Sequence, residues 1–233
     1  MFMWLLLKHG PPHGYLPEPS KSVIICKSQE ELNNVQSRLQ DYNFKYCLGH
    51  RYLGGFLGSL DSQADWIQPK VAKWCEAVCT MSKAAVRYPQ SAFAGLTKSL
   101  QAEWLYLQRV TPAMGPFFAP LEEALKQDFI PALFRDDNLP PDSRSLLGLV
   151  AKRAGIGIPN PVETAPLGFQ ASQETTYKLT LSLTHNAVLD MTEYCSTTHA
   201  VRTKHRGTRE DDETAVLEDL LPTLPHHQQR RLR

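Results

Sequence analysis

The stretch that decides the fold is IQPKVAKWCEAVCTMSKAA, residues 67–85. Its apolar residues are separated by four, three, four, three and four positions: Ile67, Val71, Trp74, Val78, Met81 and Ala85. This spacing places all of them on one face of an α-helix. We therefore predict a long helix whose apolar face packs against other helices.

Downstream of this stretch the helical spacing continues. Pro89 suits the first position of a helix, and we predict that the helix it opens ends at Thr111-Pro112. The apolar residues of this second helix are Phe93, Leu96, Leu100, Trp104 and Leu107. A third helix is predicted over 120–130, and a shorter fourth one over 142–153 with Asp142 as its cap. Three or four amphipathic helices with short connections indicate a small bundle.

The region after this bundle carries weaker signals. Glycine and proline predict a loop over 155–161. Between residues 175 and 183 the alternation of apolar and polar residues favours a strand, whereas Thr175, Leu179 and Leu183 fit a helix, which we prefer because the neighbours are helical. From residue 186 onward aromatic residues are scarce, and a basic run over 202–209 precedes the acidic run 210–213. We predict a mobile tail over 186–233 with one short helix near 215–221.

Upstream of the deciding stretch, the pattern is mixed. Residues 22–27 form a β-branched run typical of a buried strand. Ser28 and Glu31 form a capping box that opens a helix. Two further strands are predicted over 44–48 and 51–57, joined by a tight turn at Gly49-His50. The fold class is therefore α+β, mainly α, with a small β-α-β-β unit over 1–60, a helical region over 61–185 and the tail.

Composition narrows the classes of function. The 233 residues are 42% hydrophobic and carry a formal net charge of only +1, so contacts with nucleic acid would need local patches of charge. Five cysteines, an odd number, argue against a disulfide-stapled secreted protein and for an intracellular one, in cytoplasm or nucleus. The apolar residues 1–7 are too few to span a bilayer. We interpret them as the end of a helix whose beginning is missing, and predict no membrane partner.

Several short motifs follow one another along the chain, and their order is more specific than any single motif. Gly14-Tyr15 with Pro17, then residues 19–22 (PSKS) and 52–55 (YLGG), resemble motifs D and E of eukaryotic retroelement reverse transcriptases. Residues 89–110 and 129–134 are similar to the helical thumb-like region of one branch of that family. The likeness covers about residues 4–185. The chain thus resembles the C-terminal part of such a polymerase, with a palm remnant over 1–60 followed by the thumb-like helices.

The resemblance implies a set of nucleic-acid-binding residues. Lys21 matches the lysine that ends the motif D loop, and Tyr52, Leu53 and Gly54 match the primer-grip hairpin, so the implied partner is an RNA/DNA duplex. Lys73, Lys83 and Arg87 lie opposite the apolar stripe of their helix, where a thumb could meet phosphates. Each basic residue also has a plainer interpretation, because Lys21 could be an ordinary surface lysine and Glu76 interrupts a face that could simply be solvated.

Catalysis is not expected. In the family, a strand carrying one aspartate and a Tyr/Phe-x-Asp-Asp hairpin hold two metal ions, and both should precede residue 4. Phe134-Arg135-Asp136-Asp137 spells a similar motif, but Asn138-Leu139-Pro140-Pro141 follows it and cannot form a return strand, so we predict a solvated loop. We predict no catalytic residue, no cofactor and no metal site. Cys75 and Cys79, one helical turn apart without a second pair, are interpreted as core residues.

Two classes of function remain open. The first is a truncated reverse transcriptase-like protein that retains at most weak, non-specific nucleic-acid binding. The second is a non-catalytic helical scaffold that binds a protein through Trp66, Trp74 or Trp104, or a decayed reading frame without a selected function. In either case, an unpaired apolar sheet edge at 23–26 would favour self-association.

Overall fold

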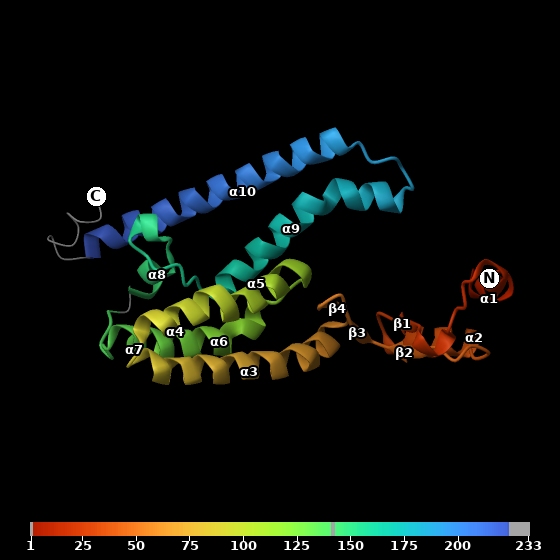
Figure 1. Cartoon of the computed structure of the whole chain (residues 1–233), viewed down its shortest axis with the longest axis horizontal. Helices are drawn as coiled ribbons and strands as arrows, with labels where there is room; N and C mark the ends of the chain where they lie inside the picture. Colours follow the sequence, from red (N-terminus) through yellow and green to blue (C-terminus); the bar gives the residue numbers. More distant parts are fainter. Residues whose placement is uncertain (1, 141–142, 224–233) are drawn as a thin grey trace. The chain divides into compact units, whose positions relative to one another are not determined.

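The computed structural model describes residues 2–140 and 143–223. Contacts divide the chain into two compact units, Met1–Trp66 and Ile67–Arg233. The first unit holds the strands and the second is helical (Figure 1). The protein is therefore α+β and mainly α, as predicted.

The first unit begins with the predicted strand, helix and strand but has one strand more than predicted, so its order is β-α-β-β-β and not β-α-β-β. Its elements are α1 (Phe2–His9), the 3-10 turns η1 (Pro11–His13) and η2 (Pro19–Lys21), β1 (Val23–Ile25), α2 (Gln29–Arg38), β2 (Lys45–Cys47), β3 (Gly49–Tyr52) and β4 (Gly55–Gly58). β1 pairs with β2 in parallel, and β3 pairs with β4 antiparallel, which gives two separate two-stranded sheets. The start of α2 has the predicted cap: Ser28 Oγ accepts a hydrogen bond from the Glu31 amide at 3.2 Å.

The hairpin turn lies elsewhere than predicted. β3 and β4 pair from Gly49↔Gly58 to Tyr52↔Gly55, so the turn is Leu53-Gly54 and not Gly49-His50. Both turn residues have positive φ, 46° and 84°, as a two-residue turn between twisted strands requires. Gly49 serves packing instead, because a Cβ there would lie 2.3 Å from Cζ of Phe56. The prediction failed because leucine rarely adopts positive φ and gave no turn signal.

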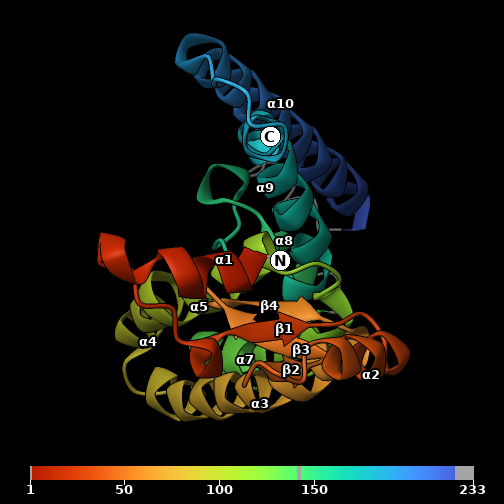
Figure 2. The same cartoon turned by 90° about the vertical axis from the view of Figure 1, so that its right-hand side faces the viewer.

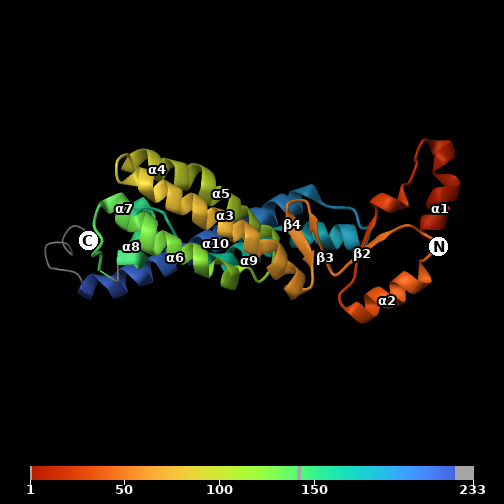
Figure 3. The ribbon, with the colours of Figure 1, turned by 90° about the horizontal axis from the view of Figure 1, so that it is seen from below.

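The second unit is built from long helices and short connecting turns. It comprises α3 (Leu60–Ala85) from residue 67 onward, α4 (Pro89–Gly95), a π-helical segment η3 (Leu96–Leu100), α5 (Gln101–Val110), η4 (Gly115–Phe118), α6 (Ala119–Ala124), a second π-helical segment η5 (Leu125–Phe129), α7 (Ile130–Phe134), α8 (Ser143–Gly148), η6 (Ala151–Arg153), α9 (Pro161–Thr184), α10 (Met191–Leu220) and η7 (Leu221–Thr223). Figures 1 and 3 show α3 alongside α4, α5 and α6.

The core of this unit forms around the predicted stripe of α3. Ile67, Val71, Val78 and Ala85 are buried, and Met81 is half-buried. Trp74 connects the stripe to its neighbours: its ring lies 6.1 Å from that of Trp104 and 6.2 Å from that of Phe118, and its indole N–H donates to Glu103 at 2.8 Å. The buried indole thus keeps a hydrogen bond, which spares the cost of an unpaired donor.

Most other helix predictions are confirmed. Residues 89–110 are helical throughout, and the third helix continues past residue 130 to Phe134. α8 and η6 occupy the predicted fourth helix but are separate, and the predicted cap Asp142 lies outside the described residues. Residues 175–183 belong to α9, so the helical alternative is the correct one.

The predicted mobile tail is wrong for most of its length. Residues 191–220 form α10, a helix of 30 residues that lies beside α9 (Figures 1 and 2). Within α10 the buried residues are Leu217 and Leu220 alone, so the apolar period that predicts a helix is nearly absent. Polar contacts supply the attachment: Lys204 and His205 approach Glu174 of α9 at 3.2 and 3.0 Å, and Asp190 caps the first turn.

Candidate nucleic-acid interface

In the first unit, Lys21 is a surface residue. It ends η2, and its Nζ lies 2.6 Å from Glu18 Oε2, with 79% of the lysine side chain exposed. An ion pair this exposed contributes little to stability. Lys21 is therefore accessible to a phosphate, but a carboxylate already partners it.

The β3–β4 hairpin of this unit has exposed side chains at its turn and a buried aromatic residue beneath them. Tyr52, in the last strand pair, is 60% exposed, and Leu53, the first residue of the turn, is 78% exposed. Beneath the turn, Phe56 is 6% exposed, and its ring stacks on that of Trp66 at 5.1 Å. An aromatic side chain at the end of β3 and an aliphatic one on the turn are thus both exposed. An exposed aromatic ring such as that of Tyr52 can stack on a base.

In the second unit, the three predicted cations are all exposed. Lys73 and Lys83 lie on α3, about 15 Å apart along its axis at ~1.5 Å per residue. Arg87 follows the helix, and its guanidinium lies 5.2 Å from the ring centre of exposed Tyr88. Glu76, also exposed, lies between the lysines in sequence. The cations form an extended row rather than a concentrated patch.

The Phe-x-Asp-Asp lookalike is a solvated turn, as predicted. Phe134 is the last residue of α7, and Arg135 has a left-handed backbone with φ 55°. Asp136 and Asp137 are exposed, and Asp136 Oδ1 accepts a hydrogen bond from the Asn138 amide at 2.9 Å. Within residues 2–140 and 143–223, no group of three or more His, Cys, Asp or Glu side chains is gathered as a metal site would need.

The two cysteines of α3 are half-buried and not fully in the core. Cys79 Sγ lies 3.2 Å from Asp128 Oδ2, and this hydrogen bond raises the pKa of the Cys79 thiol. Burial is the main cause that raises the pKa of Cys75, and the neighbouring Cys79 adds to it. Both thiols are therefore poor nucleophiles at neutral pH, since the thiolate is the reactive form.

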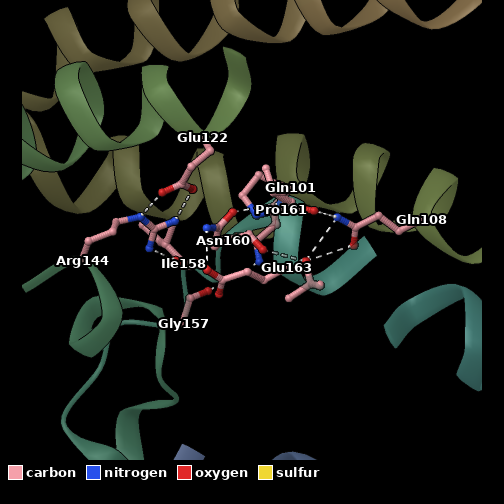
Figure 4. A network of polar contacts seen from close by, with 11 residues as sticks. Gln101, Gln108, Glu122, Arg144, Gly157, Ile158, Asn160, Pro161 and Glu163 are labelled. Atoms are coloured by element: carbon pink, nitrogen blue, oxygen red, sulfur yellow. Dashed lines mark hydrogen bonds and ion pairs between the residues drawn. The ribbon is translucent and has the colours of Figure 1, made fainter. Parts of the chain in front are cut away.

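Sequence reasoning missed the most enclosed polar network of the second unit, which Figure 4 shows from close by. Arg144 of α8 donates two hydrogen bonds to the carboxylate of Glu122 in α6, at 2.7 and 2.6 Å, and a third to the carbonyl of Ile158 at 2.7 Å. Nearby, buried Gln108 donates to the carbonyl of Pro161 at 2.8 Å. The network fastens the 155–161 loop to the helices, and partners 14 to 53 residues apart leave no local sequence signal.

A small open pocket of about 110 Å³ lies beside this network. Lys126, Ile130, Leu139 and Arg144 are among the residues that line it. Arg144 already donates to Glu122 and to the carbonyl of Ile158, so much of its guanidinium is engaged within the network.

No family model, curated protein or solved structure matches this chain. The reverse transcriptase resemblance thus stays a prediction from the motifs. Of the helices in the described residues, none combines the length and apolar character needed to cross a membrane.

Proposed function

We propose that the chain is a non-catalytic, reverse transcriptase-like protein that binds a nucleic-acid duplex weakly and without sequence preference. The observation that carries the proposal is the β3–β4 hairpin. It holds Tyr52 and Leu53 outward while Phe56 and Trp66 fix its base, and its strand β4 runs almost directly into the long helix α3. A hairpin of this kind, followed by helices, is what the resemblance implies for a primer grip and thumb.

The exposed cations of α3 would supply the electrostatic part of the affinity. Each lysine or arginine that neutralises a phosphate releases counterions, which makes binding sensitive to salt. With a net charge of +1 and only a few such contacts, we expect dissociation constants in the micromolar range or weaker, the range of non-specific binding.

We propose that this chain has no polymerase activity of its own. Nucleotidyl transfer needs carboxylates that hold two metal ions about 4 Å apart. Glu18 is paired with Lys21, Glu30 and Glu31 occupy the first turn of α2, and Asp136 and Asp137 lie on an exposed turn. We expect no primer extension on an RNA template with Mg²⁺ or Mn²⁺. Extension that disappears when Asp136 and Asp137 are both changed to Asn would overturn this part of the proposal.

The binding test uses the purified full chain and a fluorescein-labelled RNA/DNA primer-template, with anisotropy measured between 50 and 200 mM salt. We expect the Tyr52→Ala/Leu53→Ala variant to weaken binding with little change in salt dependence. The Lys73→Gln/Lys83→Gln/Arg87→Gln variant should reduce the slope of log K against log salt by about 0.9 per lost phosphate contact.

A matched control removes the same charge from exposed positions of the first unit: Lys27→Gln, Arg38→Gln and Lys45→Gln. We expect this control to change the slope by less than about one unit, the effect of a single phosphate contact. If the control and the α3 variant reduce the slope equally, general charge and not the α3 row accounts for binding. If the wild-type chain shows no binding at 50 mM salt, the proposed function is wrong.

The structure bears on the alternative of a protein-binding scaffold. Trp74 and Trp104 are 6% and 2% exposed, and Trp66 is stacked on Phe56, so these tryptophans are packing residues and not an exposed binding surface. The expectation that they could recruit a partner through exposed aromatic rings is therefore wrong for Trp74 and Trp104.

Self-association through β1 stays part of the proposal. In the described residues β1 pairs with β2 alone, and Val23, Ile24 and Ile25 are half-buried. A strand with one unpaired edge can accept a second copy by edge pairing. We expect dimers by light scattering, and Ile24→Lys should shift the population toward monomer. A monodisperse wild-type monomer at high concentration would contradict this.

A further inference from the structure

The helix α10 carries a second group of cations that the α3 row does not include. Arg202, Arg206 and Arg209 are separated by four and three positions, so they share one face of the helix, and all three are exposed. Lys204 lies on another face, where it pairs with Glu174 of α9. The acidic residues at 210–213 follow directly and bound the arginines on the C-terminal side.

Two further cations from a distant part of the chain converge on this face. Lys152 Nζ lies 2.7 Å from Glu210 Oε1, and Arg153 donates to the Glu210 carbonyl at 3.4 Å. The pKa of the Glu210 carboxyl is lowered by the hydrogen bond and charge of Lys152, and also by the charges of Arg206 and Arg209. The Glu210 carboxylate therefore lies near three basic side chains, and its main-chain carbonyl accepts from a fourth.

The ion pairs at this surface involve Lys152 and Arg209. Arg209 has Glu213 as a partner at a long 3.7 Å, and Lys152 has Glu210. Among the described residues, Arg202 and Arg206 make no side-chain hydrogen bond or ion pair, and both side chains are exposed. Arg202 and Arg206 lie at least four residues before the acidic run 210–213, and an exposed arginine on an ordered helix can bind a phosphate through two parallel hydrogen bonds.

The neighbouring residues favour nucleic acid over a membrane surface. A helix that lies on a lipid bilayer needs an apolar face with large exposed side chains. Among residues 192–220 of α10 no large hydrophobic side chain is exposed, and those that are apolar and buried pack within the unit. The arginine row extends about 10 Å along the helix at ~1.5 Å per residue. One strand of duplex presents a phosphate every ~3.4 Å of axis, so about three phosphates match this length.

We propose that Arg202, Arg206 and Arg209, with Lys152 and Arg153 beside them, form a second contact surface for a nucleic-acid phosphate backbone. It goes beyond the proposed function because it requires neither the β3–β4 hairpin nor the α3 row. Figure 1 shows α3 and α10 on opposite sides of the helical unit, so one short straight duplex contacts one surface or the other.

The test compares three variants of the full chain by anisotropy, using a labelled duplex of about 12 base pairs, a single strand of equal length, and vesicles containing phosphatidylserine. The first variant is Arg202→Gln/Arg206→Gln/Arg209→Gln, and the second replaces the same arginines with Lys. The matched control is Lys98→Gln/Lys126→Gln/Arg135→Gln, three exposed cations of the same unit. Far-UV circular dichroism and urea midpoints show whether each variant retains its fold.

We expect the glutamine variant to reduce the salt slope by about 2 to 3 on the nucleic acid it binds, from ~0.9 per phosphate contact for a duplex and ~0.7 for a single strand. The lysine variant should keep the slope within about one unit, because it keeps the charge. Loss of slope with the single strand alone assigns the surface to single strands, and loss with the duplex assigns it to duplexes.

Three outcomes would overturn the inference: an unchanged slope in a folded glutamine variant, an equal loss in the matched control, or tighter binding to the vesicles than to either nucleic acid. The Lys73→Gln/Lys83→Gln/Arg87→Gln variant, measured in parallel, separates this inference from the proposed function. If only the α3 variant loses salt slope, the α3 cations bind the nucleic acid and the α10 surface does not. If only the α10 variant loses salt slope, the α10 surface binds it and the α3 cations do not.

Discussion

Replacing Arg144 with Met tests whether the enclosed ion pair holds the second unit together. The change removes both hydrogen bonds to Glu122 and the one to the Ile158 carbonyl, while the methionine retains much of the aliphatic volume. The side chains of Arg144 and Glu122 are only 12% and 14% exposed, so water cannot readily replace the lost guanidinium. The carboxylate of Glu122 is left nearly buried and without its partner.

Breaking one side of a buried ion pair costs about 3–5 kcal/mol, chiefly because the remaining charge is unpaired. Domains of this size are stable by about 5–15 kcal/mol, so Arg144→Met should remove a large share of the stability. Adding Glu122→Met to form the double variant should restore most of the loss, because two apolar side chains leave no stranded charge. The single Glu122→Met variant completes the double-mutant cycle.

The assay is urea unfolding followed by far-UV circular dichroism and by tryptophan fluorescence, which reports on Trp74 and Trp104 in the core of this unit. Arg135→Met, at an exposed position, serves as the control for losing one cation. If Arg144→Met changes the free energy of unfolding by less than about 1 kcal/mol, the value of a surface pair, then the pair is effectively solvated and the reasoning fails. A double variant as unstable as the sum of the singles would refute it equally.

Three further predictions concern other parts of the chain. Gly49→Ala should destabilise the first unit by about 1–3 kcal/mol, because its Cβ would overlap the Phe56 ring. Gly207→Ala, with open space around it inside α10, should instead stabilise the second unit by up to about 1 kcal/mol. Urea midpoints that change in the opposite directions would contradict this. The pKa of Glu174 is lowered from 4.5 to about 2, chiefly by hydrogen bonds from Gln170 and Lys204. The contribution of Glu174 to stability is therefore complete above pH 4.5 and is lost as the pH falls toward 2. Glu174→Gln should flatten this part of the profile of urea midpoint against pH, and an unchanged profile would contradict the contact. Because the pKa values of Cys75 and Cys79 are raised, both thiols should be alkylated more slowly at pH 7.5 than the exposed Cys195. Asp128→Asn should accelerate alkylation of Cys79. Mass spectrometry of the labelled peptides measures these rates, and Cys79 reacting before Cys195 would contradict the prediction.

Regular local patterns made much of the fold predictable. The stripe of α3 and the cap at Ser28 depend on neighbouring residues, so sequence spacing was sufficient. α10 escaped detection because ion pairs to α9 attach it and its apolar residues are few. The turn at Leu53 was missed because an unusual backbone conformation there leaves no residue signal.

The candidate sites show the same division. The exposure of Lys73 and Lys83 follows from their position opposite the stripe of their own helix. The contacts of Lys152 with Glu210 and of Arg144 with Glu122 join residues that are 58 and 22 positions apart. Such contacts depend on tertiary packing and leave no periodic pattern in the sequence.

The two π-helical segments are places where the chain should tolerate the loss of one residue. Across η3 the buried positions advance from Leu96 to Gln101, a step of five, where the regular helix on either side takes steps of three or four. A π turn holds one residue more than an α turn, so deleting Ser99 would convert the segment to ordinary helix and leave Leu96 and Trp104 on the inward face. The segment η5 also holds one extra residue, although Phe129 and Ile130 are both buried after Leu125. Single-residue deletions, which rotate everything downstream by about 100° elsewhere in a helix, should be absorbed at these two places. Related chains one residue shorter there would keep the same core.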